Sequence, residues 1–274
     1  MVGYNKVVTW GFLGIALVIT LFPIYWMLAT SLTPYSAMFN PVPTLIPPSV
    51  SVEHYVDLFR NTPFLTFTKN SLIVSTASML LSVFISTLAA YAITRMRLRG
   101  RHALATLVMA TYLLPQSMLF IPMYILVSSL KLANTLLGLI LTYPTFLVPY
   151  GTWMLMSYFK TIPREIEEAA LIDGCSRWET LWRIIAPLAA PGISVVAIFS
   201  FTLAWDEFLY ALVVTTSPSV QTLPVGIAGF IVGDIFLWGR IMSASVLTAM
   251  PMVLLYTVVQ RWVVYGMTAG SVKG

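Results

Sequence analysis

Long apolar segments alternate with short polar segments along most of this 274-residue chain. A helix needs about 20 residues to cross the apolar core of a bilayer, which is about 30 Å thick. Apolar stretches of that length, separated by polar or proline-rich breaks, lie at about 7–32, 66–94, 103–127, 135–158, 192–215 and 242–263. The pattern predicts an all-α integral membrane protein with six transmembrane helices within residues 7–263, preceded by segment 1–6 and followed by tail 264–274.

The composition supports a membrane location. Hydrophobic residues make up 58% of the chain and charged residues only 9%, so a soluble fold of this size could not cover its surface with polar groups. The first apolar run is longer than the core of a secretion signal, and we expect it to remain as an anchor. The predicted location is the cell (inner) membrane, crossed several times.

The basic residues predict the orientation. With a cytoplasmic N-terminus, eleven of the fifteen lysines and arginines fall on the inner side and four on the outer side. This bias predicts that both termini are cytoplasmic. It also explains the net charge of +5 without nucleic acid, which we do not expect as a partner.

Prolines mark the irregular segments. The first outer loop carries Pro34, Pro41, Pro43, Pro47, Pro48 and Pro63, which predicts an extended external flap. Pro115, Pro122, Pro144 and Pro149 predict kinks in the third and fourth helices. Kinks favour a bundle around a pathway, although kinks that serve only packing are equally compatible with the sequence.

The loop at 159–191 is the most charged stretch of the chain and predicts two short helices. Pro163 suits a first helical turn, and Gly174 suits a left-handed C-terminal position. Ser176 followed by Glu179 predicts a capping box at the start of the second helix, which we expect Pro187 to stop.

The same loop resembles a known signature. Small Ala169 and Ala170 beside Ile166 predict a flat surface that suits a groove on another protein. The sequence Glu168-Ala169-Ala170, followed at fixed spacing by Gly174, Ile184 and Pro187, resembles the EAA motif of ABC-importer permeases. Ala186 departs from it, since the family usually has leucine there. The alternative is an ordinary amphipathic loop on the membrane surface.

In that family the loop is a coupling helix that docks into the ATP-binding subunit. The resemblance therefore implies coupling roles for Glu168, Ala169, Ala170, Asp173, Gly174, Ile184 and Pro187.

The C-terminus resembles the tail of the G-type permease of the maltose-type subfamily, as do Asn70-Ser71 and the segment 222–226. The resemblance implies contacts with the ATPase by Thr268, Ala269, Gly270, Ser271, Val272, Lys273 and Gly274. Without the family, the tail would be a disordered polar end.

The resemblance, which covers nearly the whole chain, implies a type I ABC importer permease fold. It implies a second, F-type permease, two copies of an ATP-binding subunit and an extracytoplasmic sugar-binding protein as partners, besides membrane lipid. ATP and Mg would be bound by the ATPase subunits, and we expect no cofactor on this chain.

The fifth span contains Trp205, Asp206, Glu207 and Tyr210, which we take as candidates for the solute pathway. Charge in mid-membrane is costly and usually faces the interior of a bundle. Neighbouring helical residues point about 100° apart, so the two acids should not serve one small site. A sugar contact by one acid and interhelical hydrogen bonds to the partner permease are equally compatible.

The last outer loop is rich in glycine and aromatic residues. By resemblance, Gly226, Gly229, Phe230 and Asp234 face the binding protein. An interfacial aromatic belt would give the same composition.

Several motifs are absent from the sequence. There is no Gly-x-x-x-x-Gly-Lys-Ser/Thr loop, so this chain should not hydrolyse ATP. His54, His102 and Cys175 have no partners at metal-binding or catalytic spacing, and we expect no metal site and no enzyme activity.

The interpretation is a permease subunit of a binding-protein-dependent importer for a carbohydrate, such as an oligosaccharide or disaccharide. Import of a polyol or glycerol phosphate is an alternative, and a self-sufficient secondary transporter is a weaker one. The sequence does not identify the solute.

Overall fold

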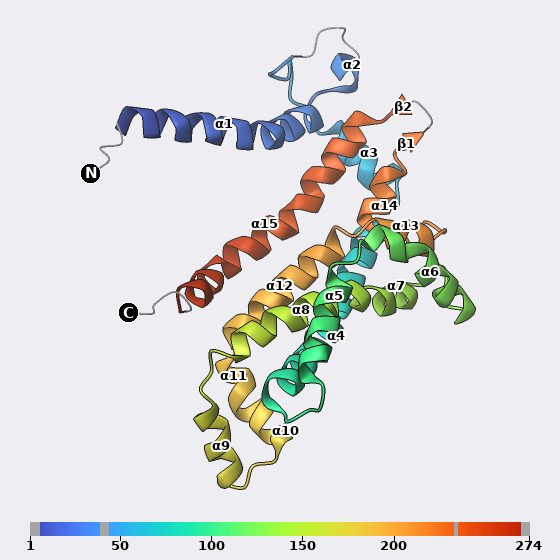
Figure 1. Cartoon of the computed structure of the whole chain (residues 1–274). Coiled ribbons are helices and arrows are strands. Elements are labelled where there is room, and N and C mark those ends of the chain that lie inside the picture. The colour runs from blue at the N-terminus through green and yellow to red at the C-terminus, as the bar shows by residue number, and fades with distance from the viewer. Residues whose placement is uncertain (1–5, 39–43, 233–234, 270–274) are drawn as a thin grey trace. The chain divides into compact units, whose positions relative to one another are not determined.

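The computed structural model describes residues 6–38, 44–232 and 235–269, and helices dominate it (Figure 1). Side chains are described in these ranges except at positions 7, 232, 235–236 and 259–269. The chain forms two compact units. The first unit comprises Met1–Leu65 with Gly226–Pro251, and the second comprises Thr66–Val225 with Met252–Gly274.

The first unit combines an apolar helix with the first outer loop and the start of the last helix. Its helices are α1 (Lys6–Ser31), α2 (Tyr35–Met38), α3 (Glu53–Asn61) and the beginning of α15 (Trp238–Ala269). Two short strands, β1 (Ile231–Val232) and β2 (Ile235–Phe236), pair antiparallel.

The first outer loop is not wholly extended, which corrects the predicted flap. The proline-free stretch within it forms α3, and this helix buries His54 and Leu58 on one face. The ring of His54 lies against Gly239, where an added Cβ would come within 2.1 Å of Nδ1. On another face of α3, Asp57 forms an ion pair with Arg240, whose Nη2 donates a hydrogen bond over 3.0 Å. The loop is thus held by packing and charge.

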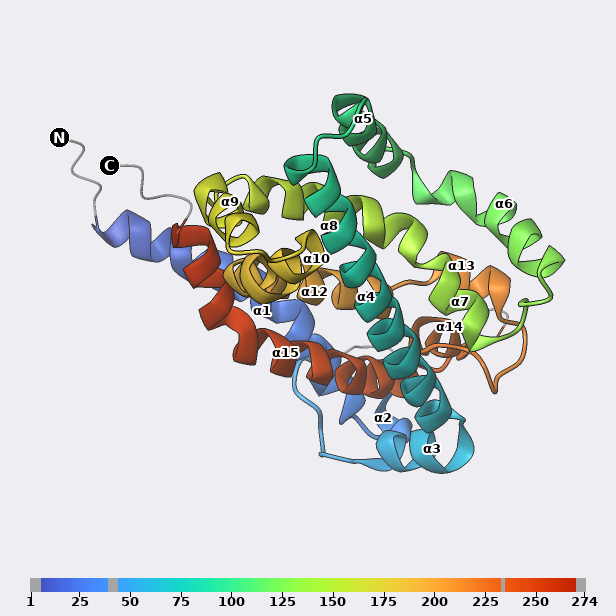
Figure 2. The same cartoon turned by 90° about the horizontal axis from the view of Figure 1, so that it is seen from below.

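The second unit contains the remaining helices (Figures 1 and 2). They are α4 (Phe64–Arg95), α5 (Arg101–Tyr112), α6 (Gln116–Ser129), α7 (Leu136–Thr142), α8 (Pro144–Phe159), α9 (Arg164–Ile172) and α10 (Arg177–Thr180). They continue with a π-helical turn η1 (Leu181–Ile185), α11 (Ala186–Leu188), α12 (Ala190–Trp205) and α13 (Leu209–Val214). The last of them, α14 (Leu223–Ala228), leads into the first unit.

Two hydrophobic clusters organise this unit. One joins the C-terminal half of α4 to α8, η1 and α12, and its fully buried members include Leu155, Phe159 and Ile185. The other joins α4, α7, α8 and α13 around Tyr143 and Leu147. Both clusters draw on α4 and α8, which therefore form the frame for the loops at either end.

The described helices account for part of the six predicted spans. In the described part of the chain, three helices are long and apolar enough to cross a membrane: Val8–Ser31, Phe64–Arg95 and Trp238–Val258. Two bent pairs raise the number to five if each counts as one span: Arg101–Tyr112 with Gln116–Ser129, bent by 97°, and Arg177–Leu188 with Ala190–Trp205, bent by 81°. Neither set includes α7 and α8, so the six-helix topology remains a prediction.

Asn70 and Ser71, the pair at the opening of the second predicted span, hold the segment that precedes α14. The amide nitrogen of Asn70 donates to the carbonyls of Ser219 and Gln221 over 3.0 and 2.9 Å. The Ser71 hydroxyl accepts a 2.7 Å hydrogen bond from the backbone of Leu223. Unpaired backbone groups in an apolar interior are costly, so these contacts allow a loop to lie against α4.

Candidate functional site

The loop between α8 and α12 has the local geometry predicted from its sequence. The helix α9 ends at Ile172, and Gly174 follows with φ of +90°, a conformation that favours glycine. Ser176 caps α10 in a capping box with Glu179. Hydrogen bonds from the backbone and hydroxyl of Ser176 lower the pKa of the Glu179 carboxyl. The predicted αL turn and capping box are therefore confirmed.

The two faces of α9 differ in a way the sequence did not show. Ala170 is buried, whereas its neighbour Ala169 and Glu168 are exposed, which corrects the prediction that the two alanines share one surface. Ile172, which does not belong to the EAA signature, is 85% exposed. The exposed face of α9 therefore offers an isoleucine and a small alanine, which suits insertion into a groove on a partner.

A buried carboxylate anchors the opposite face. Glu167 is 6% exposed, and one of its oxygens, Oε1, accepts a 2.8 Å hydrogen bond from the hydroxyl of Tyr91 in α4. The guanidinium of Arg95 lies 3.9 Å from Oε2, and that of Arg177 lies 3.7 Å from Oε1. A buried carboxylate is tolerated only with such partners, so Glu167 ties α9 both to α4 and to α10.

Arg95 extends this connection to α8. Its Nη2 donates hydrogen bonds to the carbonyls of Phe159 and Ile162, the second at 2.6 Å. The loop is therefore joined to the ends of two long helices by one buried guanidinium, and a displacement of α9 would be felt by both. The sequence signal for Glu167 was its position three residues before Ala170, on the same face of α9.

The second half of the loop departs from the prediction. Pro187 does not stop the helix, because the π-helical turn widens the path before it and α11 continues to Leu188. A proline lacks an N–H and crowds the preceding turn, and a wider turn relieves both problems. The chain bends at Ala189 instead. Ile184 is half-buried and Pro187 is exposed.

The two acids of the fifth predicted span lie at a break between helices. The helix α12 ends at Trp205 and α13 begins at Leu209, so Asp206 and Glu207 are not neighbours on one helix. Both line one hollow of about 310 Å³ together with residues such as Gln116. The prediction that the two acids do not serve one small site assumed a continuous helix, and the break between α12 and α13 removes that assumption.

The surroundings of the two acids differ. Glu207 is 7% exposed, and its two oxygens accept hydrogen bonds of 2.8 and 3.0 Å from the backbone of Tyr210 and Ala211 at the start of α13. Asp206 is exposed. Glu207 therefore holds the helix break, and Asp206 is the acid available to a solute or to a partner helix.

The two aromatic candidates lie inside the unit. Trp205 and Tyr210 are each 1% exposed. Trp205 stacks on Phe201 with 5.7 Å between ring centroids, and Tyr210 stacks on Phe146 at 5.8 Å. Their role in the solute pathway remains a prediction, and in this conformation both rings pack against other rings.

The structure describes part of the other predicted sites. Gly226 and Phe230 are buried and Gly229 is exposed, while Asp234 lies outside the described residues. In the tail, Thr268 and Ala269 form the last turn of α15. Gly270, Ser271, Val272, Lys273 and Gly274 lie outside the described residues. The described part of the chain contains no group of three His, Cys, Asp or Glu residues that could hold a metal ion.

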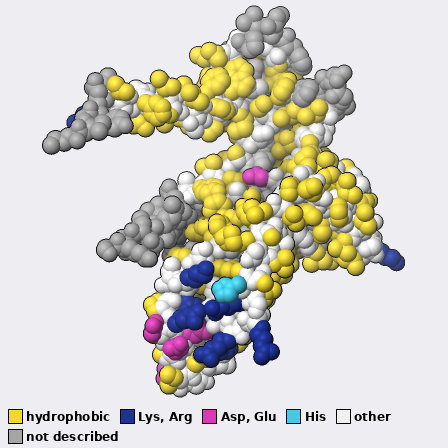
Figure 3. All heavy atoms as spheres, in the orientation of Figure 1, with side chains coloured by type: hydrophobic (Ala, Val, Ile, Leu, Met, Phe, Trp, Pro, Cys, Tyr) yellow, Lys and Arg dark blue, Asp and Glu magenta, His cyan; other side chains and the backbone are white. Residues whose placement is uncertain are grey.

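Charged side chains gather at one end of the second unit. Figure 3 shows lysines, arginines, acids and a histidine together around α9 and α10, next to a largely hydrophobic surface. Charged side chains favour an aqueous environment, and an apolar surface favours contact with lipid. This distribution is typical of helices that extend out of a membrane.

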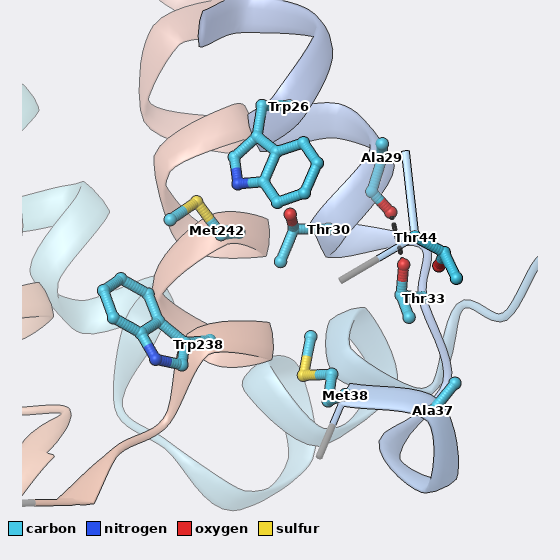
Figure 4. Close-up of a pocket in the computed structure, with 9 residues that line it drawn as sticks. All are labelled: Trp26, Ala29, Thr30, Thr33, Ala37, Met38, Thr44, Trp238 and Met242. Carbon is cyan, nitrogen blue, oxygen red and sulfur yellow. Dashed lines mark hydrogen bonds between the residues drawn. The ribbon is translucent and has the colours of Figure 1, made fainter. Parts of the chain in front are cut away.

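The first unit contains a hollow of its own, about 290 Å³ in volume, that no sequence signal indicated. Figure 4 shows Trp26 and Thr30 of α1 opposite Trp238 and Met242 of α15. No charged side chain is among the residues that line it. Its walls are mainly aromatic and aliphatic, with three threonines among them.

The chain is similar in sequence and in fold to known transport proteins. Residues 82–268 match the model of a family described as "Binding-protein-dependent transport system inner membrane component". The chain belongs to this family. It is therefore a multi-pass membrane protein of the ABC transporter permease class.

Two curated relatives and one solved structure extend the match. The chain is 39% identical to an inner membrane ABC transporter permease protein, YcjP, of Escherichia coli, over 96% of this chain and 94% of that one. It is 36% identical to a trehalose/maltose transport system permease protein, MalG, of Thermococcus litoralis, over 94% and 93%. A bacterial ABC transporter involved in alginate import has the same fold, with a TM-score of 0.83 at 21% identity over 93% and 95%.

Proposed function

We propose that the chain is a transmembrane permease subunit of an ATP-driven, binding-protein-dependent importer for a carbohydrate. It would form the pathway with a second, F-type permease and take its energy from two copies of an ATP-binding subunit. An extracytoplasmic sugar-binding protein would deliver the solute. ATP and Mg would bind to the ATPase subunits, and this chain would hydrolyse nothing.

The two-faced helix α9 is the observation that carries the proposal. Its exposed side presents Glu168, Ala169 and Ile172, and its buried side is fixed through Glu167 to α4. Because its buried side is fixed to α4, α9 would pass a displacement on to that helix. A partner that grips the exposed face would therefore move the long helices, as alternating access requires.

The hollow beside Asp206 supports an uncharged solute. It is open and lined by two carboxylates, the amide side chain of Gln116 and apolar groups such as Phe146. Carboxylate oxygens accept hydrogen bonds from sugar hydroxyls, while a phosphate group would be repelled. This favours an oligosaccharide or disaccharide over a glycerol phosphate.

The trehalose/maltose assignment of the Thermococcus relative supports a carbohydrate as the solute class. It does not extend to one sugar, because relatives of similar identity carry different names. For example, the chain is 38% identical to a sulfoquinovosyl glycerol transport system permease protein of Agrobacterium fabrum.

The test starts with purification of the tagged chain from native membranes under gentle detergent. We expect a second permease and an ATP-binding subunit to remain bound. The complex is then placed in proteoliposomes with ATP inside and the binding protein and labelled sugars outside. Sugar uptake that requires both ATP and the binding protein would confirm the proposal.

A chain that purifies without any ATPase and whose uptake follows an ion gradient would refute it. That outcome would make the chain a secondary transporter. The two results are distinguishable in one preparation, because an ionophore abolishes uptake driven by an ion gradient but leaves ATP-driven uptake intact.

A further inference from the structure

A hollow rich in arginine lies between α4, α5, α9 and α10. It has a volume of about 240 Å³, and five guanidinium groups line it. They belong to Arg95, Arg97, Arg101, Arg164 and Arg177. Two carboxylates, Glu167 and Glu168, also line it, so the hollow holds three more positive than negative charges.

The described residues do not neutralise this excess charge. Glu167 already faces both Arg95 and Arg177, and Arg164 donates to the carbonyl of Thr94 over 3.3 Å. Within the described part of the chain, no hydrogen bond or ion pair involves the side chain of Arg97 or Arg101.

Arg95 supplies a second observation. This side chain is 2% exposed, and its Nε is buried without a hydrogen-bond acceptor among the described residues, although Glu167 lies 3.9 Å away. A buried donor without an acceptor is costly. An anion in the hollow would bring oxygen atoms to these guanidinium groups.

We infer that this hollow binds the phosphate group of an anionic membrane lipid. Guanidinium groups match phosphate oxygens in geometry and charge, and they do so more specifically than ammonium groups. The three uncompensated positive charges exceed the single negative charge of a lipid phosphodiester, so several guanidinium groups can contact one lipid phosphate.

The neighbouring surface indicates a lipid source instead of free phosphate. Arg101 is the first residue of α5, a helix that buries none of its residues completely. Leu104 and Leu107 on this helix are 43% and 60% exposed, and Leu98 in the preceding turn is 36% exposed. A phosphate in the hollow would therefore place acyl chains beside an apolar surface.

The site would connect lipid to coupling. Arg97 and Arg101 belong to the junction of α4 and α5, whereas Arg164 and Arg177 belong to the loop around α9. One phosphate held by both sets would fix α9 relative to α4. This consequence rests on the proposed function, whereas lipid binding itself can be measured without an ATPase.

The experiment uses the full chain, purified in detergent and delipidated. Native mass spectrometry counts bound phosphatidylglycerol and, as a neutral-charge comparison, phosphatidylcholine. The double variant Arg97→Gln/Arg101→Gln should weaken phosphatidylglycerol binding at least about tenfold, because it removes two charge-assisted contacts. Arg99→Gln is the matched control, since Arg99 lies between them in sequence but does not line the hollow.

The expected result is selective loss in the double variant, unchanged binding in Arg99→Gln, and no displacement by millimolar inorganic phosphate. Equal losses in all variants would show unspecific surface charge and overturn the proposal. Displacement of the lipid by inorganic phosphate would assign the hollow to a free anion and overturn the lipid source. Phosphatidylcholine bound as tightly as phosphatidylglycerol would also overturn it.

The result is separable from the proposed function. If the wild-type complex binds phosphatidylglycerol selectively but shows no ATP-driven uptake, only the importer assignment is contradicted. Normal uptake with no selective lipid binding would contradict only the lipid site.

Discussion

Gly174 offers the sharpest test of the coupling loop. Its φ is +90°, and no atom of the described residues lies within 4 Å of the position that an added Cβ would occupy. An alanine there meets no steric contact inside the chain, so its cost is the backbone strain of about 1–2 kcal/mol for a left-handed L-residue. That energy corresponds to a change of roughly 5–30-fold in the population of the native turn.

The assay compares ATP-driven uptake and ATP hydrolysis in proteoliposomes that contain the assembled complex. We expect Gly174→Ala to reduce the solute transported per ATP, and Gly174→Asn to recover most of it because asparagine tolerates this conformation. Gly174→Leu adds the same strain and a larger side chain, whose Cβ meets no described atom within 4 Å. A loss beyond that of alanine would therefore report contact with the ATPase.

The strain-matched control is Gly100→Ala in the loop between α4 and α5. Gly100 has φ of +79°, and an added Cβ there also meets nothing within 4 Å. We expect a similar loss of thermal stability with unchanged solute per ATP. Normal coupling in Gly174→Ala and Gly174→Leu, measured at full membrane insertion, would refute the reasoning.

The remaining predictions concern three carboxylate sites. Glu167→Gln should destabilise the loop by about 3 kcal/mol because it breaks a buried ion pair with Arg95. Amide hydrogen exchange over residues 164–172 should therefore accelerate. Unchanged exchange would contradict the role of Glu167 in anchoring α9 to α4. Glu207→Gln should lower the melting temperature, because a glutamine has one oxygen to accept the two backbone hydrogen bonds that the two oxygens of Glu207 accept. Asp206→Asn should leave the melting temperature unchanged and reduce uptake. Identical effects of both variants on both properties would argue against this division. The hydrogen bond from Arg240 lowers the pKa of Asp57 from 3.8 to about 2, so its contribution is present above about pH 4 and lost as the pH falls through about 2. After allowance for solvent screening, we expect the Asp57–Arg240 pair to contribute ~1 kcal/mol to the free energy of unfolding. The difference in melting temperature between the wild type and Asp57→Asn should therefore shrink on acidification. A difference that stays constant with pH would disprove the linkage.

The local geometry of the coupling loop could be predicted because its signals are local. A glycine that takes positive φ, and a serine three residues before a glutamate, depend only on the backbone and its nearest neighbours. Gly174 and the Ser176 capping box were therefore predicted correctly. The extent of the second helix was not, because the π-helical turn before Pro187 depends on how η1 packs into the core around α8.

The break at Asp206 shows where periodicity fails. An apolar run looks the same whether the helix inside it is continuous or interrupted, because apolarity reports the environment and not the backbone path. Only the hydrogen bonds from Tyr210 and Ala211 to Glu207 reveal that a carboxylate replaces the helical pairing there. The shared hollow of the two acids follows from that break.

By itself the sequence determined that this chain lies in a membrane and that its loop at 159–191 resembles the EAA motif of importer permeases. These properties follow from composition and from residues close together in sequence. The tertiary structure decided which face of α9 is free, which acid is exposed and which arginines share a hollow. Each of these depends on contacts between residues far apart in the chain, such as Tyr91 with Glu167, and no local pattern encodes them.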